Sequence, residues 1–318
     1  MRPVVPYYGG KACQATRIAA LMPQARVYLE AYGGMASLML AREPSRIEVY
    51  NDLDARLVNL FRVLRDPAGA RMLREMITHT PLSLAEYARA WRLLEDAATP
   101  AVERAWALVV AAGQAFSARS RRRPGWQRSV VISQPSCWRG RLAAIDGIEH
   151  RLAPAQIECR DALEVIRTWD APWTLFYLDL PYAPSARTAG RRYRHEMSEA
   201  GHRALVAALC EVRGAVALSG YRCDAYLPLE RAGWKRKDWR AWAHAMGHTR
   251  ANGLKGKGAM KGRCERVESL WRNPRCLEML AEERRFAGEA REGRVSSRWH
   301  SWRHPERAPR EPREPGSN

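Results

Sequence analysis

The chain has 318 residues, of which 46% are hydrophobic, and this is enough to build a sizeable buried core. Its 53 Lys and Arg against 34 Asp and Glu give a formal net charge of +19, which favours a polyanionic partner; a basic protein without one is the plainer alternative. The sequence contains no apolar run of about 18 residues and no signal-peptide pattern behind Met1, so we expect neither a membrane span nor secretion.

Short apolar runs alternate with helical patterns along most of the chain. In chain order the runs are Val27–Glu30, Ile47–Tyr50, Gln156–Cys159, Thr174–Leu178, Ala215–Leu218 and Val267–Trp271. This alternation predicts a mostly parallel sheet with helices on both faces, and therefore an α/β fold. Ligands of such sheets bind outside the carboxyl ends of the strands, where this chain places Glu30, Asp52, Asp161 and Asp179.

Residues 67–150 interrupt this alternation. Two helices are predicted there, Ser83–Ala98 and Ala101–Ala118. Their large aromatic residues recur at a helical spacing that favours core packing over base stacking; these are Trp91, Trp106 and Phe116. The Arg119–Arg141 segment that follows is predicted to be a loop or a pair of hairpins. We therefore expect a helical insertion with a basic tip.

The end of the chain and the cysteines carry weaker signals. A short helix is predicted from Leu277 to Arg291, and the Arg-, Glu- and Pro-rich residues beyond it are expected to be largely disordered. The seven Cys are odd in number and include no CxxC pair, which disfavours a disulfide framework or a zinc site. A reducing cytoplasm fits this pattern best.

The tetrapeptide Asp179-Leu180-Pro181-Tyr182 follows the most apolar strand of the chain. Its residue types suit methyl transfer to an exocyclic amine such as that of adenine, whose lone pair is conjugated into the ring. The Asp179 carboxylate and the Leu180 carbonyl could accept the two N–H groups and free that lone pair. Pro181 would stiffen the turn, and Tyr182 could stack on a base that has left the duplex. An ordinary strand-ending turn is the alternative, because Asp-x-Pro is common in turns.

Two glycine-containing segments predict a cofactor site. Tyr7-Tyr8-Gly9-Gly10-Lys11 would let the backbone approach a ligand and would supply a cation for a carboxylate, although it could be a flexible turn. Glu30-Ala31-Tyr32-Gly33-Gly34 follows a strand and suits a nucleotide-like cofactor, but it lacks the dinucleotide fingerprint. Asp52 could bind two ribose hydroxyls or cap a helix, and Asp161 could bind an adenine amine of the cofactor or cap the helix beginning at Ala162.

In this order the motifs resemble the Dam-like class of adenine-specific DNA methyltransferases, in a phage- or prophage-type form. The resemblance covers roughly residues 5–274 and extends over further runs: Ile47–Asp54, Arg160–Ala162, Tyr193–Met197, Leu218–Tyr221 and Glu268–Pro274. The shared order of these motifs is far more specific than any one of them.

The resemblance implies a Rossmann-like S-adenosylmethionine-dependent methyltransferase fold, with S-adenosylmethionine as the methyl donor. It implies that this cofactor contacts Tyr7, Lys11, Asp52 and Asp179, and we extend the expected site to Gly10, Glu30, Gly33, Gly34 and Asp161. It also identifies residues 67–150 as a target-recognition insertion. The catalytic domain would then comprise residues 1–66 and 151–274, followed by the tail, 275–318.

Three positions depart from the family pattern. Leu180 stands where Pro is usual, Ala31 replaces another usual Pro, and Met35-Ala36 follows the glycine pair where Dam itself has a further Gly. At position 180 the expected role belongs to the backbone carbonyl, which Leu also provides. None of the three changes removes a side chain that the mechanism needs, so we expect an active enzyme.

Two basic stretches are expected to contact DNA, although each could instead be a solvated charged face. Arg119–Arg141 contains seven Arg and no acid, and Arg231–Arg263 contains ten Lys or Arg and one acid. The Lys235–Lys261 part is predicted to be a flexible loop that grips the DNA backbone. The expected contacts are Arg119, Arg121, Arg122, Arg123, Arg128, Arg139, Tyr193, Lys255 and Lys257.

The sequence thus predicts a metal-free monomer that binds double-stranded DNA, flips an adenine and methylates its N6 amine by direct displacement. Two alternatives stay open. One is the same chemistry on cytosine N4 or on an RNA base, and the other is a non-catalytic DNA-binding protein on the same fold.

Overall fold

The structure is a computed structural model that describes residues 1, 3–5, 7, 9–116, 125–129, 133–139, 144–186, 194–243 and 264–291. The described chain forms a seven-stranded sheet in the order β3-β2-β1-β4-β5-β7-β6. The strands are β1 (Val27–Glu30), β2 (Ile47–Asn51), β3 (Ala155–Glu158), β4 (Thr174–Asp179), β5 (Ala215–Gly220), β6 (Lys235–Ala243) and β7 (Cys264–Arg272). Strands β1 to β5 pair in parallel, whereas β7 is antiparallel to both β5 and β6. The predicted mostly parallel, Rossmann-like α/β fold is confirmed.

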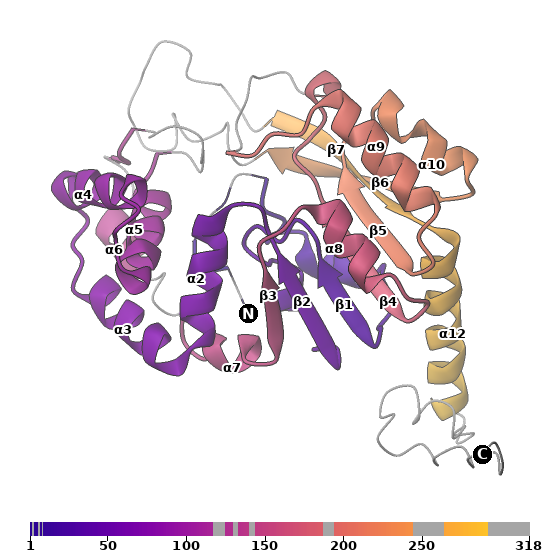
Figure 1. Ribbon diagram of the computed structural model, residues 1–318, viewed down its shortest axis with the longest axis horizontal. Coiled ribbons are helices and arrows are strands. Elements are labelled where there is room, and N and C mark those ends of the chain that lie inside the picture. Colours follow the sequence, from indigo (N-terminus) through magenta and orange to yellow (C-terminus); the bar gives the residue numbers. More distant parts are fainter. Residues whose placement is uncertain are drawn as a thin grey trace, which may run out of the picture.

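Helices cover both faces of this sheet (Figure 1). Successive side chains of β4 point to opposite faces, so that Leu175 and Tyr177 belong to one hydrophobic cluster and Phe176 and Leu178 to the other. On the first face lie α1 (Ala15–Ala19), α2 (Ala55–Arg65) and α12 (Pro274–Arg291). On the second face lie α8 (Ala162–Trp169), α9 (Glu199–Cys210) and α10 (Leu227–Arg231). Burial on both faces explains why the central strands β4 and β5 are mostly apolar.

The segment between β2 and β3 is helical beyond α2, as predicted. It forms α3 (Pro67–Thr78), α4 (Leu84–Glu95), α5 (Ala101–Gly113), α6 (Gln134–Arg139) and α7 (Ile148–Leu152). Helices α3 to α6 lie on the far side of α2 from the sheet (Figure 1). They share one hydrophobic cluster with α2 and the first face of the sheet, so the insertion is packed directly onto the fold.

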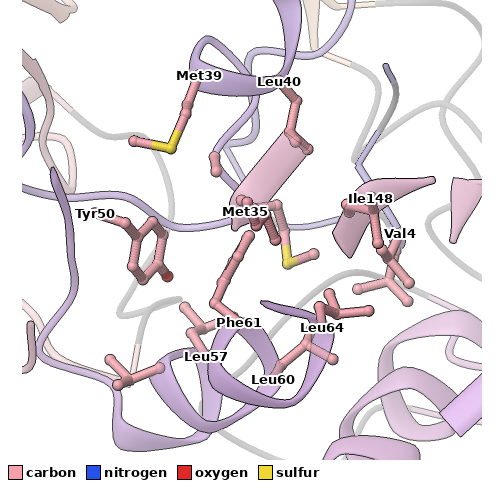
Figure 2. Packing of buried hydrophobic residues seen from close by; sticks show 14 of the residues in the cluster. Val4, Met35, Met39, Leu40, Tyr50, Leu57, Leu60, Phe61, Leu64 and Ile148 are labelled. Atoms are coloured by element: carbon pink, nitrogen blue, oxygen red, sulfur yellow. The ribbon is translucent and has the colours of Figure 1, made fainter. Parts of the chain in front are cut away.

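Close packing joins β2, α2 and the turn after β1 (Figure 2). The rings of Tyr50 and Phe61 lie with their centroids 4.3 Å apart. Met35 and Met39, from the segment after β1, pack in the same cluster, and so does Ile148 of α7. The segment that will form one wall of the site is therefore anchored in the core.

Four expectations about the elements need correction. The Lys235–Lys261 stretch begins as strand β6 and is not a loop over residues 235–243; the remaining residues lie outside the described chain. Helix α6 occupies part of the predicted loop or hairpins, and α12 begins three residues before the predicted Leu277. Trp91 and Trp106 are core residues as predicted, but Phe116 is 39% exposed because α5 ends at Gly113.

The charges of β6 explain why it was missed. Lys235, Arg236, Lys237 and Arg240 interrupt the apolar pattern, and the strand lies at the edge of the sheet beside β7. Charged residues are common on edge strands because they prevent pairing with other chains. Among the described residues, no helix is long and apolar enough to cross a membrane, and no three His, Cys, Asp or Glu side chains gather as a metal-binding group.

Candidate active site

A cavity of about 340 Å³ lies at the carboxyl ends of the parallel strands. Its walls come from the N-terminal segment, from the residues after β1, β2, β3 and β4, and from the start of α9. The strand order reverses beside β1, which has β2 on one side and β4 on the other, and open α/β sheets bind ligands at such a switch point. The predicted residues that line the cavity are Tyr7, Gly10, Lys11, Glu30, Gly33, Gly34, Asp52, Asp161, Asp179 and Pro181.

The glycine pair after β1 has a packing reason and a backbone reason. A Cβ on Gly33 would lie 2.3 Å from Cε2 of Tyr50, so no larger residue fits against β2. Gly34 has φ +52°, in the left-handed region that glycine adopts easily, and its N–H donates to Oδ2 of Asp52 at 2.8 Å. The turn is thus tied directly to the acid that ends the neighbouring strand.

Asp52 does not cap helix α2. Asp54 does so by accepting from the N–H of Arg56, while Asp52 accepts from the N–H groups of Gly34 and Asp54. Burial raises the pKa of Asp52 to about 6, against the lowering effect of these backbone hydrogen bonds. A carboxylate has about four acceptor positions, so Asp52 can still accept from hydroxyl groups in the cavity.

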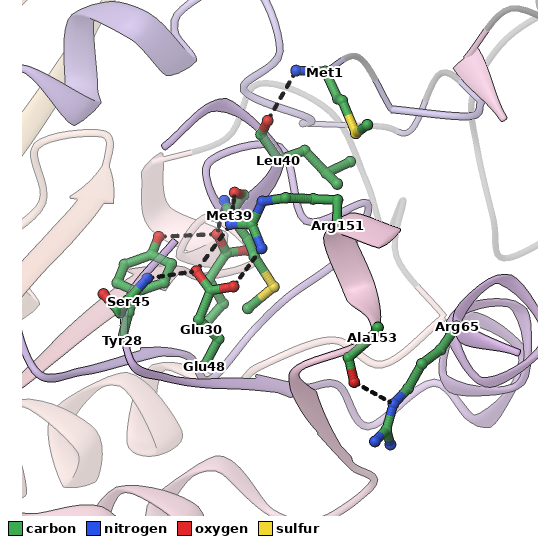
Figure 3. Close-up of polar contacts among 10 residues, drawn as sticks. All are labelled: Met1, Tyr28, Glu30, Met39, Leu40, Ser45, Glu48, Arg65, Arg151 and Ala153. Carbon is green, nitrogen blue, oxygen red and sulfur yellow. Dashed lines mark hydrogen bonds and ion pairs between the residues drawn. The ribbon is translucent and has the colours of Figure 1, made fainter. Parts of the chain in front are cut away.

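Glu30 forms the floor of the cavity and is 2% exposed. Its Oε1 accepts from the Tyr28 hydroxyl at 2.9 Å and from the N–H of Met39 at 2.6 Å (Figure 3). Burial raises the pKa of Glu30 to about 8, so this acid holds its proton at neutral pH. Figure 3 also shows Arg151 of α7 bound to the Glu48 carboxylate and the Met39 carbonyl, which ties the end of the insertion to this wall.

Lys11 lies where the N-terminal segment meets the end of β4. Its ammonium is 3.0 Å from Oδ1 of Asp179 and 3.6 Å from Oε2 of Glu268, and it donates to the Tyr182 hydroxyl at 2.9 Å. That hydroxyl donates in turn to Oε1 of Glu268 at 2.9 Å. The cation that we expected to meet a cofactor carboxylate is therefore already shared between two carboxylates of the protein.

Asp179 has the most exposed side chain of the three charged groups in this cluster. Its side chain is 20% exposed and lines the cavity, whereas the side chains of Lys11 and Glu268 are 2% and 6% exposed. Burial raises the pKa of Asp179 to about 6; Lys11 opposes this rise and the charge of Glu268 adds to it. Above that pH, Asp179 offers an ionised acceptor to any N–H group in the cavity.

The residues after Asp179 pack more tightly than the sequence suggested. Leu180 is 2% exposed and its side chain belongs to the cluster on the second face of the sheet. Tyr182 is 8% exposed, and its ring stacks on that of Tyr221, with centroids 4.0 Å apart and planes 5° from parallel. Tyr221 thus covers one face of the ring that we expected to stack on a base.

Asp161 serves as the N-cap of α8, because its Oδ1 accepts from the N–H of Leu163 at 2.9 Å. The same residue is exposed on the wall of the cavity. The two interpretations of Asp161 are therefore compatible: a capping carboxylate retains acceptor positions that can face a ligand.

Most of the predicted DNA contacts lie outside the described residues: Arg119, Arg121, Arg122, Arg123, Tyr193, Lys255 and Lys257. Arg128 is described, and its guanidinium lies 5.8 Å from the centroid of the Trp126 ring. Arg139 ends helix α6. Neither position tests the predicted DNA contact.

Sequence reasoning gave no role to three residues that shape the site. Asn51 donates its side-chain amide to the carbonyls of Ala31 and Arg160 and so joins the segments after β1 and β3. Glu268 and Tyr221 surround Tyr182 as described above. An acid inside the apolar run Val267–Trp271 was the available signal for Glu268. Glu268 and Tyr221 both lie in runs of the family resemblance, Glu268–Pro274 and Leu218–Tyr221, but the resemblance assigned neither of them a role.

Comparison of the sequence with protein-family models and with curated proteins finds no match. Among solved structures, the chain is similar to a precorrin 8W decarboxylase of Methanobacterium thermoautotrophicum, with a TM-score of 0.34 and 10% identity over 86% of this chain and 95% of that one. It is also similar to a precorrin-6y C5,15-methyltransferase from Geobacter metallireducens GS-15, with a TM-score of 0.32 and 10% identity over 86% and 98%. Likenesses this distant do not bear on activity or substrate.

Proposed function

We propose that this protein is an S-adenosylmethionine-dependent DNA methyltransferase that modifies the N6 amine of a flipped adenine. The observation that carries the proposal is the position of Asp179. This carboxylate, at the end of β4, lines the same cavity as the Gly33-Gly34 turn and Asp52. An acceptor suited to an amine thus lies beside a site suited to a nucleoside.

The cofactor fits the part of the cavity formed by the ends of β1, β2 and β3. The glycine turn lets a ligand approach the backbone, Asp52 suits the two ribose hydroxyls, and Asp161 can accept from an adenine amine. The cavity of about 340 Å³ falls within the usual range for small-molecule sites. Bound there, S-adenosylmethionine supplies an electrophilic methyl group, and the sheet order agrees with the fold that the family resemblance implies.

The chain's own residues then act on the amine. The Asp179 carboxylate accepts one N–H, the backbone carbonyl of Leu180 accepts the other, and the lone pair is freed from the ring. Buried packing of the Leu180 side chain fixes that carbonyl without the usual Pro. Catalysis comes mostly from alignment of the amine, and the proton is released to Asp179 or water after transfer.

The target base has to enter beside Tyr182. Lys11 and Glu268 hold the Tyr182 hydroxyl, so the ring has a fixed position, whereas Tyr221 directly follows β5 and is only partly buried. A base that stacks on the covered face of Tyr182 must displace Tyr221. Base–aromatic stacking, worth about 1–3 kcal/mol per base, can offset that displacement.

DNA is the proposed polyanion on two grounds. The chain has a net charge of +19, and the motif order is that of adenine-specific DNA enzymes. The helices α3 to α6 lie beside the fold and, with the basic Arg119–Arg141 stretch of the sequence, are the proposed target-recognition region. Their packing on α2 gives this region a fixed base from which to read a site.

Mass spectrometry of nucleosides tests the proposal. Unmethylated plasmid and, in a parallel reaction, RNA are incubated with the protein and S-adenosylmethionine and then digested to nucleosides, and cofactor binding is measured separately by calorimetry. We expect N6-methyl-2′-deoxyadenosine from the wild type, none from Asp179→Asn, and wild-type levels from Glu278→Gln, whose ion pair with Arg275 in α12 is exposed. Methylcytosine alone, or methylation of RNA alone, would replace the adenine assignment by one of its two rivals. Cofactor binding without transfer by the wild type would indicate a non-catalytic DNA-binding protein.

A further inference from the structure

Glu268 is a buried acid in the antiparallel strand β7, and no ligand needs to reach it. It is 4% exposed, and its neighbours in the strand, Ser269, Leu270 and Trp271, are buried as well. A carboxylate in such a place is stable only with partners. Those partners are Lys11 and Tyr182, both of them part of the candidate active site.

The ion pairs of this cluster that the described residues form join one cation to two carboxylates. One ammonium, that of Lys11, faces the two carboxylates of Asp179 and Glu268. With all three groups ionised, the cluster has one negative charge more than positive. The nearer contact is the one to Asp179, at 3.0 Å against 3.6 Å, so Glu268 competes for the ammonium without removing it.

We propose that Glu268 is a positioning residue that holds Lys11 and Tyr182 and leaves Asp179 available as the acceptor for the substrate amine. The inference rests on the proposed function. A lysine paired with Asp179 alone would satisfy that carboxylate and weaken it as an acceptor. Because Glu268 shares the ammonium and also accepts the Tyr182 hydroxyl, the lysine stays in place without neutralising Asp179 completely.

Removal of the Glu268 charge should shift the pKa of Asp179 in a defined direction. The charge of Glu268 contributes to the raised pKa of Asp179, while Lys11 lowers it. Replacing Glu268 by Gln removes the repulsion and also removes the second carboxylate that competes for the Lys11 ammonium, so both effects lower the pKa of Asp179. Among the described residues, Glu30, Tyr177 and Tyr226 also interact electrostatically with Asp179, and the change to Gln leaves them unchanged.

The experiment combines Glu268→Gln with carboxyl-¹³C aspartate labelling. The resonance of Asp179, assigned by its loss in Asp179→Asn, is titrated by NMR in the full chain, and kcat/KM for DNA is measured across the same pH range. In Glu268→Gln we expect the Asp179 titration and the acid limb of kcat/KM to move down together by about one pH unit. The matched control is Glu265→Gln on the same strand, whose carboxylate pairs with the exposed Arg240; it should leave both unchanged.

A second variant gives the opposite sign. Tyr182→Phe removes the hydroxyl that Glu268 accepts, so Glu268 draws the ammonium away from Asp179 and the Asp179 titration should move up. An Asp179 titration that matches the wild type in either variant overturns the positioning role. If the titrations move as stated but wild-type protein methylates no DNA, the proposed function fails and the positioning role of Glu268 stands.

Discussion

Replacement of Lys11 by Met measures how much the buried ammonium contributes to the stability of the protein. The side chains of Lys11 and Glu268 are almost fully buried, and the ammonium lies within 4 Å of two carboxylates. Methionine keeps the unbranched apolar stem, so the change removes the charge with little change in packing. Breaking a buried ion pair leaves an uncompensated charge, and we expect the unfolding free energy at neutral pH to fall by about 3–5 kcal/mol.

This loss should depend on pH in a defined direction. Burial already raises the pKa of Asp179 to about 6 in the wild type, where Lys11 limits the rise. Without Lys11 the folded-state pKa lies still further above the unfolded value. An acid whose pKa is higher in the folded state than in the unfolded state contributes stability that is complete below its unfolded pKa, here about pH 4. This contribution is lost as the pH rises through the folded pKa. The difference from the wild type should therefore be small at pH 5 and large at pH 8.

Urea unfolding, followed by tryptophan fluorescence, gives the unfolding free energies of the wild type and of Lys11→Met at pH 5 and at pH 8. The control is Lys237→Met, at an exposed position of β6, which should leave stability within about 0.5 kcal/mol of the wild type. An equal loss for Lys11→Met at pH 5 and pH 8, or a loss below about 1 kcal/mol at pH 8, would refute the shared-ammonium reasoning.

Three further changes probe the surroundings of the site. Arg151→Met strands the buried Glu48 carboxylate and should lower the unfolding free energy by about 3–5 kcal/mol in urea; a loss under about 1 kcal/mol would contradict the role of this pair. Because burial raises the pKa of Glu30 to about 8, the unfolding free energy of the wild type should fall by on the order of 3 kcal/mol between pH 4 and pH 7. Glu30→Gln should flatten the curve of unfolding free energy against pH over this range, and an unchanged slope would contradict the raised pKa. Leu180→Pro should preserve or raise turnover per folded molecule while lowering stability by about 1–2 kcal/mol through lost burial; a collapse of kcat at full folding would show that position 180 is misread.

The central parallel strands β4 and β5 could be predicted because each is a buried, mostly apolar run that ends in a polar residue or glycine. Thr174–Leu178 and Ala215–Leu218 differ from the observed β4 and β5 by only one or two residues at the carboxyl end. Strand β6 could not be predicted by the same rule, since an edge strand needs no apolar run and its charges imitate a loop. Phe116 was misplaced because nothing in the apolar pattern marked the end of α5.

The positions of the site were predictable, but several contacts were not. The rule that ligands bind at the carboxyl ends of strands brought Glu30, Asp52 and Asp179 to one cavity. The partners of Lys11 depend on a contact between residues 11 and 268, and no local pattern encodes a pairing over that separation. The stacking of Tyr182 on Tyr221 likewise arises from the parallel pairing of β4 with β5, which places the turns after both strands side by side.

Modification-sensitive sequencing of DNA from cells that express the protein tests the central claim most directly, because it reports base and site together. We predict N6-methyladenine at one short recurring sequence with the wild type and an unmodified genome with Asp179→Asn. Two results would contradict the assignment of Asp179 as the acceptor for an adenine amine. One is modified cytosine at the recurring site, and the other is an unmodified genome in cells that contain folded wild-type protein.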